Sequence, residues 1–409
     1  MRFDHKTLRV DLDPRDPHFF NDPYPAYAAM HAAGSPLFFW DQYDHWCTAS
    51  FAHVSALLRD KRFGRQILHV ATREELGWPE PPPHLAPHTA VMQYALLEVE
   101  PPVHTRLRTL VNRAFVSRQV EKLAPRIAEM AHALVDGFER DGACDLLARF
   151  CTPIPVTVIA ELLGVPVEMC PALLDWSHRM VAIHQFRRDR AVEEDAAAAT
   201  TAFAGYLRGL LDQRLKEPRD DLVTHLAAAS ANSDRLTDEE TVATCIQLLN
   251  AGHEATVHAF ANGIAGLLQN GIDVRAAFSD ERSRALVVEE MLRHDAPLHL
   301  FTRYALEDVE IGPARLRKGD KIGLLLGGAN RDPSRFADPD RFDPLREDNA
   351  QVSFGAGIHF CIGAPLARLE MQVALPILFE RLPGLRLASK PAYRDTYHFH
   401  GFERLDAVW

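Results

Sequence analysis

The sequence predicts a mainly α protein with a small β portion, and two observations carry this prediction. First, six segments repeat apolar residues at the spacing of one helix face. They are residues 104–115, 119–138, 156–164, 198–215, 237–270 and 283–294. Second, residues 301–326 carry short β-branched and apolar runs separated by Gly-Pro and Lys-Gly-Asp, which is typical of short strands joined by turns.

Two further segments complete the expected order of elements. Residues 76–102 contain the run Gly-Trp-Pro-Glu-Pro-Pro-Pro-His-Leu-Ala-Pro, and so many prolines favour an irregular loop over a helix. Helical spacing returns after residue 360. Because no repeat, low-complexity tract or linker divides the 409 residues, we expect a single domain over 1–409.

The composition excludes several classes of protein. With 45 Lys+Arg against 56 Asp+Glu, the net charge of −11 argues against a general nucleic-acid binder, whose affinity comes from neutralising phosphates. The six cysteines show no CxxC spacing, which argues against a disulfide framework or a structural zinc site. The polar N-terminal residues lack the pattern of a signal peptide or membrane anchor, so we expect a cytoplasmic protein.

The segment from Thr241 to Ile272 predicts a long, central helix. Glu254 is its only formally charged residue, so the helix suits the core, and scattered polar residues argue against a membrane span. Thr237, followed by three acidic residues, fits a capping box at the start of this helix.

Glu254 needs an explanation, because an ionised carboxylate is costly to bury without a partner. Either a core partner neutralises it or it donates protons beside a reaction site, and both interpretations stay open. Ala251 and Gly252, just before it, leave room for a flat or bulky group. His253, Glu254 and His258 resemble a zinc-protease motif, but the histidines stand five residues apart instead of four, which separates their imidazoles around the helix.

Cys361 differs from the other cysteines in its surroundings. It follows Gly355 and Gly357, which permit a tight loop, and it precedes a helical stretch. A cysteine at a helix N-terminus has its thiolate stabilised by backbone N–H groups and the helix dipole, which suits a metal ligand. The alternative for a lone cysteine is a small buried apolar residue. We expect that role for Cys47, Cys144, Cys151, Cys170 and Cys245.

The residues around Cys361 form a ten-residue pattern, Phe354-x-x-Gly357-x-x-x-Cys361-x-Gly363. This pattern resembles the haem-binding signature of the cytochrome P450 family in its soluble, bacterial form. The resemblance implies the cytochrome P450 fold, with haem b (iron protoporphyrin IX) between the long central helix and the cysteine loop. The Cys361 thiolate is then the axial ligand of the iron.

Other motifs follow in the order that this family shows. Glu290 and Arg293 resemble its ExxR motif, and Arg341 resembles the third member of its buried Glu-Arg-Arg network. Residues 329–333 and 21–27 resemble two further family segments, so the likeness covers nearly the whole chain. We expect the network to hold the haem-side loop in place through charge-assisted hydrogen bonds.

The resemblance also assigns residues to the haem and to the substrate. The cations expected at the haem propionates are His104, Arg108, Arg303 and His359. The remaining haem contacts are expected from the loop residues Phe354, Gly355 and Gly363. The expected pocket residues are Leu248, Ala251, Ala255, Leu298, Leu300, Phe301 and Phe402. Most of these are apolar, so we expect a small or medium apolar organic substrate.

The expected catalytic segment, Gly252 with Glu254, Ala255 and Thr256, departs from the family pattern. The family places Thr directly after the acid, but position 255 is Ala. One helical step turns a side chain by about 100°, so Thr256 should not replace that hydroxyl. Three consequences are open: a substrate hydroxyl or ordered water takes its place, electron use is poorly coupled to product, or peroxide supplies oxygen and electrons. We favour the first, with Glu254 supplying protons.

The resemblance implies a monooxygenase that inserts one atom of O₂, with electrons from NAD(P)H through a ferredoxin reductase and a ferredoxin. Residues 105–126 carry six basic residues against one Glu, a net charge of +5. Either a solvated helix face or a docking surface for an acidic ferredoxin explains this charge. We assign docking to Arg106, Arg113 and Arg118, and we expect a monomer. The alternatives are a peroxygenase or other haem-thiolate enzyme and, from another class, a non-catalytic haem gas sensor.

Overall fold

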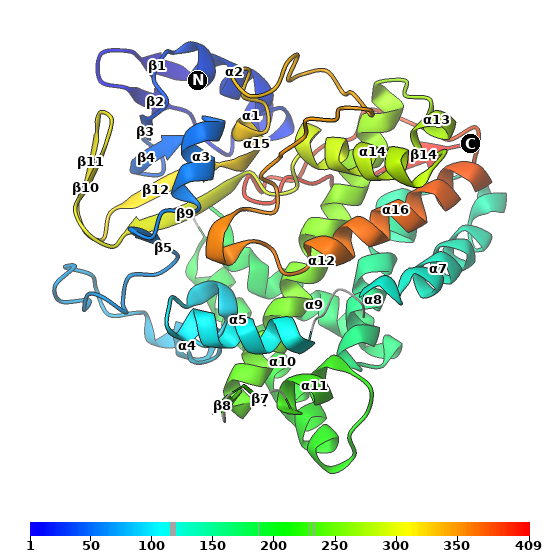
Figure 1. Ribbon diagram of the computed structural model, residues 1–409, viewed down its shortest axis with the longest axis horizontal. Helices are drawn as coiled ribbons and strands as arrows, with labels where there is room; N and C mark the ends of the chain where they lie inside the picture. Colours follow the sequence, from blue (N-terminus) through cyan, green and yellow to red (C-terminus); the bar gives the residue numbers. More distant parts are fainter. Residues whose placement is uncertain (115–119, 187, 229, 232–233) are drawn as a thin grey trace. The chain divides into compact units, whose positions relative to one another are not determined.

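The computed structural model describes the chain apart from residues 115–119, 187, 229 and 232–233. Contacts between residues divide the chain into two compact units. Unit 1 comprises Met1–Ile67, Ala124–Thr152 and Ala255–Trp409, and unit 2 comprises Leu68–Leu123 and Pro153–Glu254. The boundary at residues 254 and 255 falls inside one continuous helix, α12 (Asp238–Gln269) (Figure 1). The single domain therefore stays a prediction.

Unit 1 is built on a seven-stranded sheet of order β1-β2-β3-β4-β12-β9-β5. Its strands are β1 (Arg2–Asp4), β2 (Arg9–Asp11), β3 (Phe38–Trp40), β4 (His45–Thr48), β5 (Phe63–Gly64), β9 (Leu300–Ala305) and β12 (Lys321–Leu325). β12 pairs antiparallel with β9 and parallel with β4, so that Ile322 lies opposite both Arg303 and Trp46. A hairpin of β10 (Val309–Ile311) and β11 (Ala314–Leu316) stands between β9 and β12 in the sequence. The strands predicted within 301–326 are thus confirmed.

Side chains from the two faces of this sheet belong to two different apolar clusters, because successive side chains along a strand point to opposite faces. Ile322 and Leu324 of β12 pack with Val54 in one cluster. Leu325 packs with Trp40 in the other. The central strand is therefore covered on both sides.

Unit 1 contains further helices besides the C-terminal half of α12. They are α1 (Pro17–Asn21), α2 (Tyr24–Ala32), α3 (Phe51–Leu57), α7 (Ala124–Asp136), α13 (Val274–Ala277), α14 (Glu281–His294), α15 (Leu326–Ala329) and α16 (Ala364–Arg381). α16 packs against α7 and α14 (Figure 1). A three-stranded sheet completes the unit, with β13 (Arg386–Leu387), β14 (Asp406–Val408) and β6 (Ala143–Asp145).

Unit 2 is almost entirely helical. Its helices are α4 (Ala86–Met92), α5 (Val103–Ala114), α8 (Pro153–Leu163), α9 (Cys170–Val181), α10 (Arg190–Lys216), α11 (Leu222–Ala228) and the first half of α12. A short ladder joins β7 (Ser230–Ala231) to β8 (Asp234–Arg235). α10 packs against both α9 and α4. The prediction of a wholly irregular loop over 76–102 is wrong at α4, because Pro87 stands in the first turn, where a helix tolerates proline.

The predicted capping box at the start of α12 is confirmed. The backbone N–H of Thr237 donates to Oε2 of Glu240 at 2.9 Å, and the N–H of Glu240 donates to Oγ1 of Thr237 at 3.2 Å. These reciprocal bonds satisfy two of the N–H groups that a helix N-terminus leaves open.

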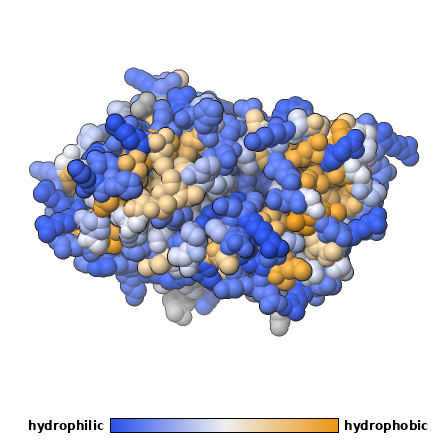
Figure 2. All heavy atoms as spheres, turned by 90° about the horizontal axis from the view of Figure 1, so that it is seen from above, coloured by the Kyte–Doolittle hydropathy of each residue, from blue (hydrophilic) through white to orange (hydrophobic). Residues whose placement is uncertain are grey.

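Figure 2 shows one face on which hydrophilic residues predominate, with separate hydrophobic areas between them. None of the described helices is long and apolar enough to cross a membrane. Two exposed apolar side chains, Ile358 and Phe360, stand just before Cys361.

Candidate functional site

Cys361 lies at the end of a tightly closed loop in unit 1. Gly355 and Gly357 adopt φ values of +68° and +71°, a region that favours glycine. A Cβ at Gly357 would also collide with the backbone carbonyl of Leu58. The N–H of Cys361 donates to the carbonyl of Phe354 at 3.0 Å, which closes the loop before α16 begins at Ala364.

The cysteines differ in how deeply they are buried. Cys47, Cys151 and Cys245 are buried, and burial raises the pKa of the Cys245 thiol to about 12. These three therefore fit the expected role of small apolar residues. Cys361 is half-buried, and a Cβ added at Gly363 would contact its Sγ at 3.9 Å. The remaining two, Cys144 and Cys170, are half-buried rather than buried.

Two guanidinium groups meet beside β9 in unit 1. Nη1 of the buried Arg303 donates to the carbonyl of Thr302 at 3.0 Å, and Nη1 of Arg65 donates to the same carbonyl at 3.4 Å. Both groups also lie near the ring of Phe301, at 5.9 and 5.8 Å from its centroid. The concentrated positive charge suits carboxylate groups such as the haem propionates. Arg65 was not predicted from the sequence. It follows directly after β5, whose pairing with β9 places it beside that strand.

The other predicted haem cations lie on a turn of unit 1 and on a helix of unit 2. His359 is half-buried in a 3₁₀ turn (Gly357–His359) just before Cys361. In unit 2, His104 and Arg108 lie one turn apart on α5 and so share a helix face. His104 is buried, whereas Arg108 is half-buried.

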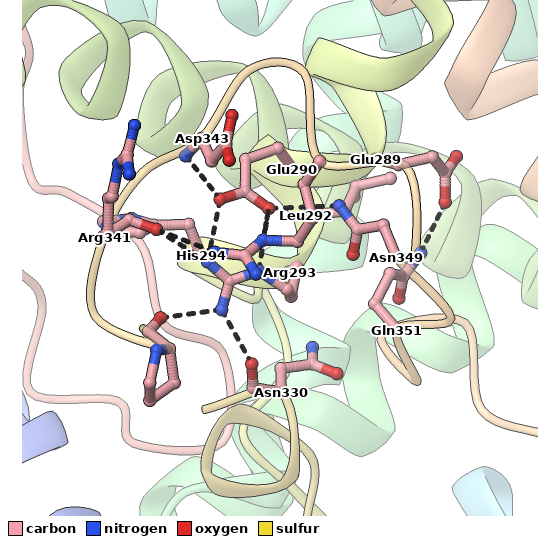
Figure 3. A network of polar contacts seen from close by, with 12 residues as sticks. Glu289, Glu290, Leu292, Arg293, His294, Asn330, Arg341, Asp343, Asn349 and Gln351 are labelled. Atoms are coloured by element: carbon pink, nitrogen blue, oxygen red, sulfur yellow. Dashed lines mark hydrogen bonds and ion pairs between the residues drawn. The ribbon is translucent and has the colours of Figure 1, made fainter. Parts of the chain in front are cut away.

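Glu290 and Arg293 of α14 form a fully buried ion pair in unit 1. Arg293 donates through Nε to Oε2 of Glu290 at 2.7 Å and through Nη2 to Oε1 at 2.8 Å, a bidentate geometry. Its remaining N–H groups donate to the carbonyls of Asn330, Pro339 and Arg341 (Figure 3). This pair therefore ties α14 to the segment that precedes the Cys361 loop.

The prediction that the side chain of Arg341 is the third member of this network is wrong. The Arg341 side chain is exposed, and its backbone carbonyl accepts from Arg293 at 3.1 Å (Figure 3). Arg346 takes the predicted place, because its Nε donates to Oε2 of Glu290 at 3.2 Å. The chain bends between these two residues, so that a later arginine faces the carboxylate.

Glu254 is buried and has a partner from another helix. Nε2 of His178, on α9, lies 3.0 Å from Oε1 of Glu254. The Glu254 side chain is 7% exposed, whereas that of His178 is 48% exposed. The carboxylate thus has a partner, as the interpretation of a neutralised core residue requires. That partner is exposed to solvent, as the interpretation of a proton donor requires. His178 was not predicted from the sequence, because the residue spacing within α12 does not identify a partner on α9.

The small residues around Glu254 face different surroundings. Gly252 packs on α8, where an added Cβ would lie 3.3 Å from Cγ1 of Ile159, so it makes room for this side chain. Ala251 is exposed and Ala255 is half-buried, and they lie one turn apart on the same face of α12. Thr256 is 6% exposed and lies on the buried side, as the helical step predicts.

The predicted pocket residues divide into two groups. Leu298 and Phe301 are half-buried, whereas Leu248, Leu300 and Phe402 are buried. Leu300 belongs to the apolar cluster around Trp40, and the ring of Phe402 lies 4.1 Å from that of Tyr393. Leu300 and Phe402 therefore pack in apolar surroundings, and their lining role stays a prediction.

The basic segment is partly neutralised within the chain. Arg106 forms an ion pair with Glu240 and donates to the carbonyl of Arg235 at 3.1 Å. Arg113 is exposed on α5. The third residue predicted for docking, Arg118, lies outside the described residues.

The residues present fit a haem. The closed loop presents the half-buried thiol of Cys361, the guanidinium pair at β9 suits propionates, and α12 offers a face with small side chains. A cysteine thiolate that ligates the iron, with cations for the propionates, is the donor set that a haem-thiolate protein requires.

Comparisons with known proteins identify the family. A family model described as cytochrome P450 matches residues 285–383. Cytochrome P450 107B1 of Saccharopolyspora erythraea is 38% identical over 88% of each chain. Cytochrome P450 monooxygenase PikC of Streptomyces venezuelae is 37% identical over 98% of this chain and 94% of its own. The chain belongs to the cytochrome P450 family, and it is an oxygenase that binds haem through the Cys361 thiolate.

Solved structures agree in fold. The crystal structure of P450BioI in complex with hexadec-9Z-enoic acid ligated acyl carrier protein matches with a TM-score of 0.88 and 32% identity. The match covers 96% of this chain and 99% of that one. The mainly helical architecture with a smaller β part is therefore the cytochrome P450 fold.

Proposed function

We propose that the chain is an O₂-dependent monooxygenase for apolar organic substrates and that Glu254 supplies its protons without a hydroxyl at position 255. One oxygen atom enters a C–H bond of the substrate, and the other leaves as water, which consumes two electrons and two protons. The observation that carries the proposal is the buried Glu254 carboxylate, 3.0 Å from the exposed His178. The name of PikC, a monooxygenase, supports the same reaction class.

The chain's own residues have distinct roles in this proposal. Haem with a thiolate ligand supplies the activation of O₂ and the transfer of one oxygen atom. Cys361 holds the iron, and we assign the propionates to Arg303 and Arg65 with His359, and to His104 with Arg108. The Glu290–Arg293 pair positions the segment that leads to the cysteine loop.

We assign proton supply to the contact between His178 of α9 and Glu254 of α12. His178 exchanges protons with solvent, because half of its side chain is exposed, and passes them to the buried Oε1 of Glu254. Ala255 offers no hydroxyl beyond this carboxylate, and Thr256 is turned to the buried side of the helix. A substrate hydroxyl or an ordered water completes the path.

The substrate is an apolar molecule of small or medium size. Leu298, Phe301 and Ala251 offer apolar, accessible side chains. The related P450BioI was crystallised with a long unsaturated acyl chain, which supports an apolar substrate class.

Electrons come from NAD(P)H through a reductase and an acidic ferredoxin. We assign docking to Arg113, because it is exposed on α5 within the basic segment. Arg113→Glu should slow ferredoxin-driven reduction at low salt, whereas Arg219→Glu, the same change at another exposed site of unit 2, should not. Equal rates for the two variants would remove the assignment. We expect the enzyme to act as a monomer in the cytoplasm.

Glu254→Gln tests proton supply directly. With ferredoxin, reductase and NAD(P)H, the variant should form product about 100-fold more slowly, the usual contribution of a positioned proton donor. Peroxide brings its own protons and electrons, so peroxide-driven turnover should fall far less. Equal losses in the two assays would contradict the role of Glu254. A wild-type enzyme that forms product only with peroxide would instead favour a peroxygenase.

A further inference from the structure

We propose that His178, His253 and Glu254 of unit 2 form a binding site for a divalent transition-metal ion such as Zn²⁺. Nε2 of His178 lies 3.0 Å from Oε1 of Glu254, and Nε2 of His253 lies 3.7 Å from the same oxygen. All three ligand atoms lie within 4.8 Å of one another. In a tetrahedral zinc site with bonds of about 2.0–2.1 Å, neighbouring ligand atoms lie about 3.3 Å apart. Small side-chain adjustments therefore accommodate the ion.

His253 is already oriented as a metal ligand. Its Nδ1 lies 2.8 Å from the carbonyl of Leu249, and because a carbonyl only accepts, Nδ1 carries the proton. Nε2 then presents a lone pair toward Glu254. This atom is buried in a side chain that is 1% exposed, and it has no hydrogen-bond partner among the described residues. Metal-binding histidines are commonly held in this way, with the second ring nitrogen donating to a carbonyl.

The donor set and the access route select the kind of ion. Two imidazoles and one carboxylate are a common zinc donor set that leaves a fourth position for water, whereas Mg²⁺ and Ca²⁺ prefer oxygen ligands. The Glu254 side chain is 7% exposed, but that of His178 is 48% exposed, so an ion can enter from solvent. This site is distinct from the rejected zinc-protease motif, because its second histidine comes from α9 and not from position 258.

Occupancy of this site has a functional consequence, which rests on the proposed function. A carboxylate bound to Zn²⁺ no longer carries protons. Micromolar zinc should therefore slow O₂-dependent turnover, with half-inhibition at the concentration that half-fills the site.

Titration calorimetry of ZnCl₂ into the tag-free holoenzyme tests the site without any turnover. We expect one ion per chain. His178→Ala should weaken binding at least about tenfold, since even the loss of a residue behind a ligand costs about 10–100-fold. His178 is largely exposed, so this variant should fold. The matched control is His225→Ala, which removes an exposed histidine 3.2 Å from Asp220 and should leave the affinity unchanged.

The possible results separate the site from the proposed function. Binding that needs His178 but not His225, with two imidazoles in the zinc X-ray absorption spectrum, supports the site. Absence of stoichiometric binding, or equal affinity in His178→Ala, overturns it. If zinc binds through His178 and turnover does not change, the site stands and the proton role of Glu254 fails.

Discussion

The role of a single residue in this chain depends on its surroundings as well as on its type. Glu254 and Glu370 are both buried carboxyl groups in a helix, but Glu254 has a histidine partner at 3.0 Å. Oε2 of Glu370 has no hydrogen-bond partner in the part of the chain that the structure describes. The first arrangement suits proton transfer, whereas the second is a cost to stability.

Ala255→Thr restores the hydroxyl that the family usually places after the acid. We expect a higher ratio of product formed to NAD(P)H consumed, because a fixed hydroxyl next to Glu254 completes the proton path within the protein. The measurement compares this ratio in the variant and the wild type, with Ala255→Val as the control for bulk alone. An unchanged ratio would show that position 255 does not limit coupling.

Glu370 makes stability depend on pH. Burial raises the pKa of its carboxyl well above the usual range, so the group stays protonated in the fold while the unfolded chain ionises above about pH 4.3. The free energy of unfolding then falls as pH rises, by about 1.4 kcal/mol per pH unit until the folded pKa is reached. Glu370→Gln should remove this slope.

Urea unfolding at pH 5 and pH 8 tests the effect of Glu370. The stability advantage of the variant over the wild type should be larger at pH 8 than at pH 5 by about 1.4 kcal/mol or more. The same difference at both pH values would contradict a protonated, buried Glu370.

At the scale of elements, α14 shows how one helix organises distant segments. Its buried Glu290 accepts from Arg293, from Nε of Arg346, from Asn349 at 3.0 Å and from the backbone of Asp343 at 2.7 Å. Each donor beyond Arg293 comes from the stretch between the sheet and the cysteine loop. The carboxylate therefore holds that stretch against the helix.

Arg346→Ala and Arg341→Ala separate two versions of this network. Loss of the Arg346 side chain should cost about 2 kcal/mol, the usual size of a hydrogen bond to a charged group. Arg341→Ala should cost less than about 0.5 kcal/mol, as is usual at exposed positions, since only its backbone joins the network. Denaturant unfolding measures both. A larger loss for Arg341→Ala would restore the arrangement expected from the sequence.

The spacing of residues in the sequence predicted the elements that have a local periodic pattern. It did not predict contacts between segments that are distant in the sequence. The periodicity of α12, its capping box and the strands within 301–326 were all predicted, because neighbouring residues encode them. α9, with a short and interrupted apolar pattern, was missed, and His178 with it. Arg65 and Arg346 were missed for another reason. Strand pairing and a bend of the chain decide their positions, and neither leaves a local signal.

At the scale of the whole molecule, charge and burial are unevenly distributed. The net charge of −11 contains a basic segment at 105–126, part of whose charge is neutralised by Glu240. The longest helix carries a single acid in its interior, and the half-buried Cys361 follows a loop that contains two glycines with positive φ. In each case the exception to the general pattern marks a residue that the proposed reaction uses.

The ligation of haem iron by Cys361 is the central claim, and the spectrum of the reduced protein with carbon monoxide tests it most directly. The wild type should show the Soret band shifted to long wavelength that thiolate ligation produces. Cys361→His, which keeps a ligand for the iron, should bind haem and lose that shift. A wild-type protein without the shifted band, or a Cys361→His variant that retains it, would contradict the assignment.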